Sequence, residues 1–191
     1  MKKELAPIMS EASYHTVYYS PLGAIVLESD GDKLTALRFD GQSGPCAFEK
    51  SAPIAHGLPR KVGIGELAVF SQTGEWLDRY FGGMIPGPIP PISFRSTPFR
   101  ETVWELLSAI PYGRTAAYGE LAEKIADRRG VRRISAQAVG GALAHNPILI
   151  VVPCHRVIGA GGDPKGYAGG IRRKEALLRL ERETLAAEKR G

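Results

Sequence analysis

Apolar positions near the N-terminus follow the spacing of β-strands. Residues 17–19 and 23–27 are rich in β-branched, aromatic and aliphatic side chains, and residues 34–39 alternate apolar with polar positions. Asp30-Gly31-Asp32 lies between the last two of these stretches and is typical of a turn. We therefore expect a small antiparallel sheet over residues 14–39.

The spacing changes to that of a helix over residues 64–81. Apolar side chains recur there at helical intervals, at Ile64, Leu67, Phe70, Leu77, Tyr80 and Phe81. Residues 82–91 then combine glycines and prolines so densely that regular structure is excluded. We interpret residues 1–82 as an N-terminal α/β domain, residues 83–93 as a linker and residues 94–191 as a second domain.

Amphipathic segments predict that the second domain is mainly α-helical. Thr97 and Pro98 are a typical cap and first residue, and the helix that they begin ends at Pro111-Tyr112-Gly113. Further helices are expected over about residues 118–127, 135–145 and 173–188. The second and third helices of this domain, joined by a basic turn, resemble a helix-turn-helix.

The third of these helices has an unusual surface. Its core face is expected at Ala138, Val139, Ala142 and Leu143, which leaves a slim opposite face with Gln137, Gly140 and Gly141. Each glycine inside a helix costs about 1 kcal/mol relative to alanine, so a close approach is implied. That approach is either tight helix–helix packing or the minor groove of a nucleic acid, with Arg132 and Arg133 near phosphates.

Composition adds limits rather than a function. The chain has 191 residues, of which 43% are hydrophobic and 24% charged, as in an ordinary globular protein. The net charge of +5 suits a polyanionic partner, although the arginine clusters at 128–133 and 172–182 also fit a solvated face. No secretory leader or membrane-spanning run is recognisable, so we expect a cytoplasmic protein without membrane contact.

The cysteines and histidines do not predict a metal or a disulfide framework. The chain contains two cysteines, Cys46 and Cys154, and its four histidines are scattered without metal-ligand spacing. We expect no metal and no cofactor. Cys154 stands out because it ends an apolar run, in Pro153-Cys154-His155-Arg156.

This sequence suggests a nucleophilic thiol. A neighbouring imidazole and guanidinium favour the thiolate, which is the reactive form of cysteine. In a regular strand Cys154 and His155 would point to opposite faces, but Pro153 favours a turn that lets them cooperate. The alternative is an inert, buried cysteine that packs as a small hydrophobe. A glycine-rich loop follows at residues 159–170 with Tyr167 inside it, and it is either a recognition loop or merely mobile surface.

Residues 94–181 resemble the O6-alkylguanine-DNA alkyltransferases. The resemblance is carried by motifs in the family's order and spacing: Pro98-Phe99-Arg100, Ile110-Pro111-Tyr112-Gly113, Ala138-Val139-Gly140-Gly141-Ala142, Asn146-Pro147, Pro153-Cys154-His155-Arg156 and Gly166-Tyr167-Ala168-Gly169-Gly170. It implies DNA repair by irreversible transfer of an alkyl group to a cysteine, without a cofactor. The N-terminal half is compatible with the family's variable α/β domain.

The resemblance also implies chemical roles. Cys154 would accept the alkyl group, His155 would take its proton through a water, and Glu181 would orient the imidazole. Tyr167 would donate toward the departing guanine, supported by Lys174.

On the DNA side, the resemblance implies binding through the minor groove and flipping of the damaged guanine out of the stack. Tyr118 would press on the 3′ phosphate, and Asn146 would hold the active-site turn. Carbonyls of Cys154 and Val157 would read the exocyclic amine of the base. Further contacts are expected from Arg132, Arg133, Gln137, Ala138, Gly140, Gly141, Arg156, Ala168 and Gly169. The expected partner of a monomeric protein is double-stranded DNA with O6-alkylguanine and, less favourably, O4-alkylthymine.

The chain departs from the family pattern at a few positions. Gln137 occupies the place of an arginine that fills the gap left by the flipped base, which predicts weaker DNA affinity. Ala168 replaces a serine found in some members, so contact there would be through the backbone. Cys46 has no partner cysteine for the zinc site of some members, and we expect no role for it.

Other functions remain open at this point. A non-catalytic alkyltransferase-like DNA-binding protein would lack Cys154. A helix-turn-helix regulator with Cys154 as a sensor fits poorly, because few side chains on the slim helix could read base edges. A cysteine hydrolase would leave the helix-turn-helix unexplained.

Overall fold

The computed structural model describes residues 13–42 and 60–190, so Cys46 lies outside the described residues. The N-terminal half is a sheet of β1 (Tyr14–Ser20), β2 (Gly23–Ser29), β3 (Leu34–Phe39) and β4 (Arg60–Lys61), in the order β3-β2-β1-β4. The β1–β2 and β2–β3 pairs are antiparallel, as predicted. The sequence did not predict β4, which pairs in parallel with β1 and makes the sheet mixed.

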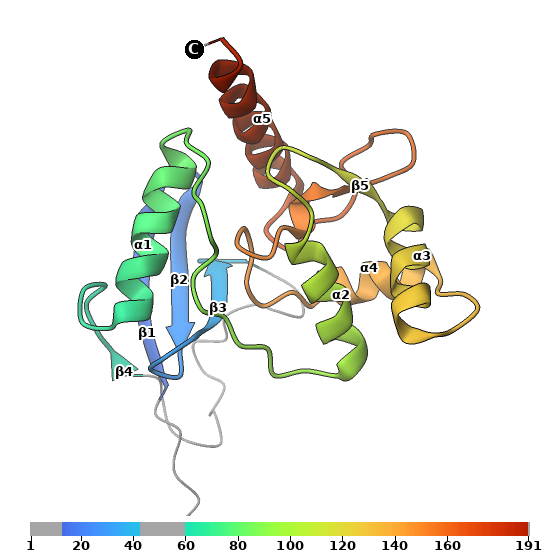
Figure 1. Ribbon diagram of the computed structural model, residues 1–191. Helices are drawn as coiled ribbons and strands as arrows, with labels where there is room; N and C mark the ends of the chain where they lie inside the picture. The colour runs from blue at the N-terminus through green and yellow to red at the C-terminus, as the bar shows by residue number, and fades with distance from the viewer. Residues whose placement is uncertain (1–12, 43–59, 191) are drawn as a thin grey trace, which may run out of the picture.

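One helix, α1 (Ala68–Phe81), covers a face of this sheet (Figure 1). Alternation along the strands places Ile25, Leu27 and Leu37 in the core, each fully buried. The predicted helix began at residue 64, whereas α1 begins at residue 68, because Leu67 is still extended at its N-cap. Gly63 and Gly65 disfavour an earlier start.

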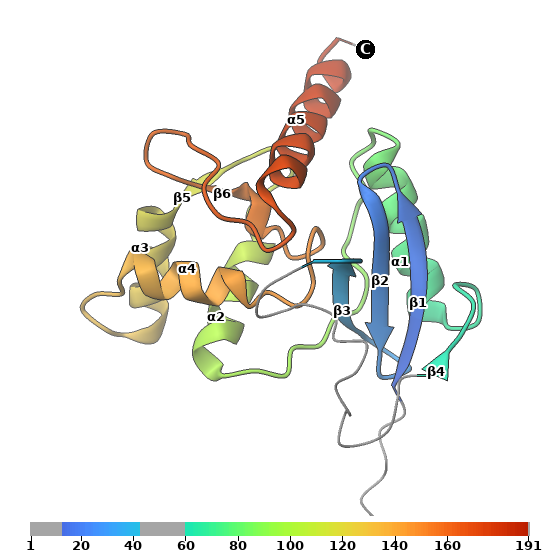
Figure 2. The same cartoon turned by 180° about the vertical axis from the view of Figure 1, so that it is seen from behind.

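The second half contains α2 (Pro98–Ser108), α3 (Tyr118–Arg129), α4 (Ala136–Ala144) and α5 (Ile171–Glu188). Helices α2, α3 and α4 pack together, and α5 rises beside them toward the sheet side of the molecule (Figure 2). Thr97 and Ser135 cap α2 and α4 through their side chains, and Gly130 ends α3 in the left-handed conformation. The predicted helices are therefore present, with α3 slightly longer than expected.

The edge strand β3 joins the two halves. Its Leu34 exchanges backbone hydrogen bonds with Pro91 (2.8 Å) and Ser93 (3.0 Å), so the segment predicted as a linker is packed against the sheet. Its Leu37 does the same with Pro147 and Leu149, each at 2.9 Å. The hydrophobic core consequently runs through both halves, and the sheet braces the segment that leads to Cys154.

Two smaller features refine the sequence prediction. Ala138 is exposed rather than in the core of α4, whose buried positions are Val139, Ala142 and Leu143. The indole of Trp104 on α2 donates to the carbonyl of Ala142 (2.9 Å), which fixes α4 in place. Within residues 13–42 and 60–190, no helix is long and apolar enough to span a membrane.

Candidate active site

The apolar run before Cys154 is a buried turn, not a strand. Val152 N–H donates to Ile148 (3.0 Å), and Val151 N–H donates to Leu149 (2.8 Å). Ile150 between them has a φ of 68°, which is strained for a β-branched residue and is held there by complete burial. Beyond Pro153 the chain forms one turn of 3-10 helix, Cys154–Arg156, so Cys154 and His155 do not follow the alternation of a strand.

Asn146, which follows the end of α4, fixes this turn and the thiol. Its Nδ2 donates to the carbonyl of Val152 (2.8 Å) and to Sγ of Cys154 (3.1 Å), while its Oδ1 accepts from Ile148 N–H (3.0 Å). Asn146 is fully buried and Cys154 is 3% exposed. The amide therefore ties α4, the turn and the sulfur into one unit.

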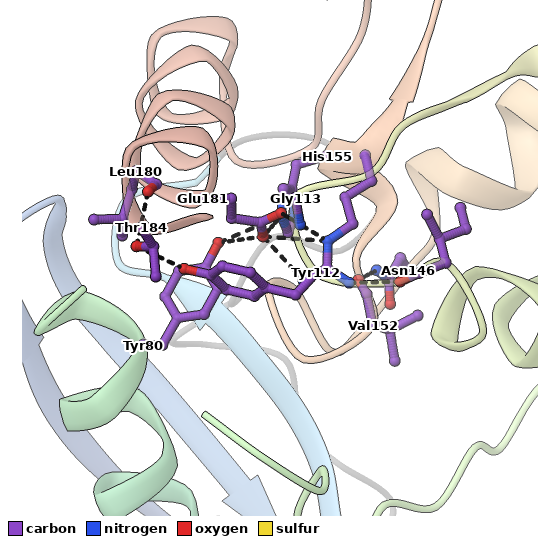
Figure 3. Close-up of polar contacts among 11 residues, drawn as sticks. Tyr80, Tyr112, Gly113, Asn146, Val152, His155, Leu180, Glu181 and Thr184 are labelled. Carbon is purple, nitrogen blue, oxygen red and sulfur yellow. Dashed lines mark hydrogen bonds and ion pairs between the residues drawn. The ribbon is translucent and has the colours of Figure 1, made fainter. Parts of the chain in front are cut away.

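Glu181 on α5 is the centre of a buried polar network (Figure 3). Its Oε1 lies 2.8 Å from Nε2 of His155 and accepts from the hydroxyl of Tyr80 (2.7 Å). Arg156 donates from Nε to both carboxylate oxygens at 3.2 and 3.0 Å, and Gly113 N–H donates to Oε2 (2.8 Å). Burial acts to raise the pKa of Glu181, but His155 and Arg156 outweigh it and lower the pKa to about 2.

The carboxylate determines the state of His155. Because an ionised carboxylate only accepts, Nε2 of His155 carries the hydrogen that bonds to Glu181. Burial lowers the pKa of His155 in spite of the opposing effect of Glu181, so the imidazole is neutral. Its other nitrogen, Nδ1, is buried and has no hydrogen-bond partner in the described part of the chain. Among the described residues, Nδ1 of His155 therefore offers an unpaired basic lone pair.

Cys154 opens into a cavity of about 190 Å³. Its lining comes from α3, α4, the 3-10 turn Cys154–Arg156 (hereafter the thiol turn) and the glycine-rich loop: Tyr118, Gly140, Leu143, Ala144, Cys154, Gly166, Tyr167 and Ala168. The hydroxyl of Tyr167 is buried without a hydrogen-bond partner among the described residues. Burial and the nearby Cys154 raise its pKa well above the usual value, so the hydroxyl stays protonated and can donate to a ligand.

Lys174 holds the glycine-rich loop by its backbone. Its Nζ donates to the carbonyls of Val157 (2.5 Å), Lys165 (2.9 Å) and Gly166 (3.1 Å). Burial lowers its pKa to about 8. The expected support of Tyr167 by Lys174 is therefore indirect, because the ammonium anchors the loop instead of contacting the phenol.

The C-terminal end of the same loop is fixed by the N-terminal half. Arg173 donates to the carbonyls of Leu22 (3.0 Å) and Gly169 (3.1 Å), and its guanidinium lies 4.2 Å from the centre of the Phe39 ring. A Cβ on Gly169 would come within 2.6 Å of the Tyr167 ring. Gly169 is buried, so its role is close packing behind Tyr167.

The glycines of α4 have no such packing reason in the part of the chain that the structure describes. There, a Cβ on Gly141 would meet nothing within 4 Å, and one on Gly140 would meet only Tyr118, at 4.0 Å. Tight helix–helix packing is therefore not the cause of the Gly140-Gly141 pair. Exposed side chains surround this face and the turn before it: Arg132, Arg133, Gln137 and Ala138. The two arginines also line a hollow of about 470 Å³ between α3 and α4.

Some predicted site residues are engaged differently from the expectation. Arg156, expected among the DNA or substrate contacts, is 7% exposed, and its guanidinium binds Glu181 and the carbonyl of Ile110 (2.6 Å). Tyr118 already donates to the carbonyl of Lys165 (3.1 Å). The carbonyls of Cys154 and Val157 accept from Val157 N–H and Lys174 respectively, which leaves each a second lone pair.

Besides Arg156, two further partners of Glu181 were not predicted. Tyr80 looked like an apolar residue of a helix in the other half, and Gly113 like the end of a helix. No local pattern reveals either contact, because they join positions 101 and 68 residues apart.

Comparisons with known proteins agree with this architecture. Residues 13–85 match the ribonuclease-like domain of 6-O-methylguanine DNA methyltransferase, and residues 98–183 match its DNA binding domain. A methylated-DNA–protein-cysteine methyltransferase of Mycobacterium bovis is 41% identical over 169 residues, 88% of this chain and 92% of that protein. The enzyme of the same name from Haemophilus influenzae is 36% identical over 175 residues, 90% of this chain and 87% of that protein.

Solved structures give the same result. The crystal structure of Mycobacterium tuberculosis O6-methylguanine methyltransferase has a TM-score of 0.72 and 40% identity, covering 90% of this chain and 94% of that one. A structure of the Mycobacterium tuberculosis protein in complex with DNA has a TM-score of 0.71 and 38% identity over the same shares. The chain therefore belongs to the 6-O-methylguanine DNA methyltransferase family, the methylated-DNA–protein-cysteine methyltransferases, and is a DNA-binding enzyme of DNA repair.

Proposed function

We propose that this methyltransferase removes the alkyl group from O6 of guanine in double-stranded DNA and keeps it on Sγ of Cys154. One observation carries the assignment. The cavity that holds the thiol also holds the phenol of Tyr167, and neither this phenol nor the buried Nδ1 of the neighbouring His155 has a hydrogen-bond partner within residues 13–42 and 60–190. A proton acceptor and a proton donor are thus both free near the nucleophile.

The reaction follows from these groups. The thiol proton passes to Nδ1 of His155, through a water, while Glu181 stabilises the imidazolium. The bond between Sγ and the alkyl carbon forms as the bond between that carbon and O6 breaks, and its electron pair returns to guanine. Tyr167 donates toward the base as negative charge develops there. Guanine leaves with the proton that Tyr167 donates, and the proton held by His155 returns to the Tyr167 phenolate through water, so the protein loses only the thiol proton. Because a thioether is stable, each molecule reacts once.

Access to the lesion requires base flipping, because O6 of a stacked guanine cannot reach a buried thiol. We assign DNA binding to the helix-turn-helix of α3 and α4, with α4 in the minor groove. The open space beside Gly140 and Gly141 and the exposed Arg132 and Arg133 support this orientation. Gln137 is exposed on the same helix, and it fills the gap left by the flipped base. Tyr118 presses on the 3′ phosphate after it releases Lys165.

The proposal also covers the range of substrates, the contact to the alkylated oxygen, the oligomeric state and the location of the protein. The protein acts on O4-alkylthymine less well than on O6-alkylguanine, and the backbone of Ala168 contacts the alkylated oxygen. It works as a monomer in the cytoplasm.

Intact mass and peptide mapping test the proposal directly. The protein is mixed with an excess of duplex DNA carrying one O6-methylguanine, and Cys154→Ser serves as the matched control. We expect a gain of one methyl group, on the peptide with Cys154, that stops at one per molecule. Tight binding to the lesion without any mass change would refute the transfer and leave only recognition.

A further inference from the structure

Tyr80 brings the N-terminal half into contact with the catalytic network. It lies in the last turn of α1, and its side chain is fully buried. Its hydroxyl donates to Oε1 of Glu181 (2.7 Å) and is 3.4 Å from Nε2 of His155. The hydroxyl therefore contacts both partners of the hydrogen bond that orients the imidazole (Figure 3).

The position of this hydroxyl is fixed by packing. The Tyr80 ring stacks on Trp76 at 5.4 Å between centroids, and it meets the edges of Phe81 (5.4 Å) and Tyr112 (5.7 Å). Burial, followed by the charge of Glu181, raises the pKa of Tyr80 well above its usual value, so the phenol remains a donor. A rigid ring with a permanent O–H is suited to orient a neighbour.

We propose that Tyr80 is a positioning residue for alkyl transfer: by binding Glu181 it keeps His155 as the neutral Nε2–H tautomer, with Nδ1 free to take the proton of Cys154. The inference rests on the proposed function of Cys154. It assigns the N-terminal half a part in the chemistry, although the cavity lining comes from the C-terminal half alone.

Tyr80 affects the pKa of His155 because both side chains bind the carboxylate of Glu181. Each donor on the carboxylate withdraws negative charge that would otherwise stabilise the imidazolium of His155. Removal of the Tyr80 hydroxyl concentrates that charge on His155 and raises the pKa of the imidazole. The other titratable or charged groups around the pair remain unchanged: Tyr112 from the segment after α2, Cys154 and Arg156 from the thiol turn, Tyr167 from the glycine-rich loop and Lys174 from α5.

The expected signature is a change in the pH profile. A histidine with a raised pKa is protonated over a wider acidic range, and an imidazolium cannot accept the thiol proton. A tyrosine that only fills space and satisfies a buried carboxylate would affect thermal stability, but it would leave the pH dependence of the transfer unchanged.

The experiment measures the second-order rate of methyl transfer from O6-methylguanine DNA between about pH 6 and pH 9 for Tyr80→Phe. We expect a loss of about tenfold at the acid end and of less than about threefold at the alkaline end, with unchanged DNA affinity. Tyr112→Phe is the matched control, because its hydroxyl binds Thr184 (3.2 Å) and not Glu181. It should keep the wild-type profile.

A double-mutant cycle distinguishes an effect of Tyr80 through Glu181 from a general loss of structure. If Tyr80 acts through Glu181, then Tyr80→Phe should have almost no further effect in a Glu181→Gln background. Additive losses, or a Tyr80→Phe profile parallel to that of the wild type, would overturn the inference. Absence of methyl transfer by the wild-type protein in the same assay would instead refute the proposed function, so the two failures are distinguishable.

Discussion

The network around Glu181 and the face around α4 are built on opposite principles. Glu181 is fully buried, and both of its carboxylate oxygens accept hydrogen bonds from other groups of the protein. On the α4 side, a Cβ added at Gly140 or Gly141 would meet almost nothing among the described residues, and the adjoining cavity holds the hydroxyl of Tyr167, which has no hydrogen-bond partner there. The network around Glu181 is thus complete within the protein, whereas the cavity beside α4 contains a buried polar atom without a described partner, a cost that a bound ligand would offset.

The largest effect is expected from Glu181→Gln. It removes the carboxylate that orients His155 and leaves Arg156 buried without its counter-charge, at a cost of about 3–5 kcal/mol in the free energy of unfolding. The rate of methyl transfer should fall at least about hundredfold, because the wrong histidine tautomer becomes accessible. Chemical denaturation and single-turnover kinetics measure the two effects. Wild-type stability in this variant would show that Arg156 does not depend on the carboxylate of Glu181 as its counter-charge.

The same carboxylate predicts the response of the wild-type protein to acid. The pKa of Glu181 is lowered to about 2 in the folded state, so its contribution is complete above the unfolded pKa of about 4.5 and is lost as pH falls toward 2. The lost stability amounts to about 3 kcal/mol. Denaturation between about pH 6 and pH 3 checks the onset of this loss. In Glu181→Gln this loss of stability at acid pH should be absent. An equally steep pH dependence of the free energy of unfolding in that variant would show that other groups cause it.

A smaller effect should follow from Gly113→Ala. Gly113 has a φ of 68°, and a Cβ there would lie 2.2 Å from Cδ1 of Leu185 on α5. Strain and repacking should cost about 2–4 kcal/mol in the free energy of unfolding and displace the N–H that binds Glu181. Thermal unfolding measures the loss.

Gly130→Ala is the control for this substitution. Its φ is 63°, but a Cβ there meets nothing within 4 Å, so only the backbone penalty of about 1 kcal/mol remains. Equal losses in the two variants would show that the contact between Gly113 and α5 is unimportant.

The smallest change in stability is expected at Gly141 on the exposed face of α4, and there it should be a gain rather than a loss. Gly141→Ala should stabilise α4 by about 1 kcal/mol, because the new methyl group meets no described residue within 4 Å. It should weaken DNA binding about tenfold, since the methyl occupies space that the DNA backbone needs. Transfer from the free base O6-methylguanine is the control and should stay unchanged. Undiminished DNA affinity would place the DNA on another face.

Local signals predicted the helices well, because caps and periodicity act over a few residues. Thr97 and Ser135 cap their helices where the sequence indicated a boundary. Strand β4 was not predicted, because a strand of two residues has no periodicity of its own and depends on pairing with β1. Ala138 was wrongly predicted to lie in the core of α4, because the width of the buried face of a helix depends on the elements that pack against it.

The sequence by itself determined the Pro153-Cys154-His155-Arg156 motif, the family resemblance and the order of the longer helices and strands, because each of these depends on adjacent or regularly spaced residues. It did not determine which groups surround Glu181. Tyr80 and Gly113 reach this carboxylate only when α1, the segment after α2 and α5 meet, and Arg156 turns inward to it rather than outward to DNA. Tertiary structure decides such contacts, because a buried charge must collect its partners from whichever segments pack around it.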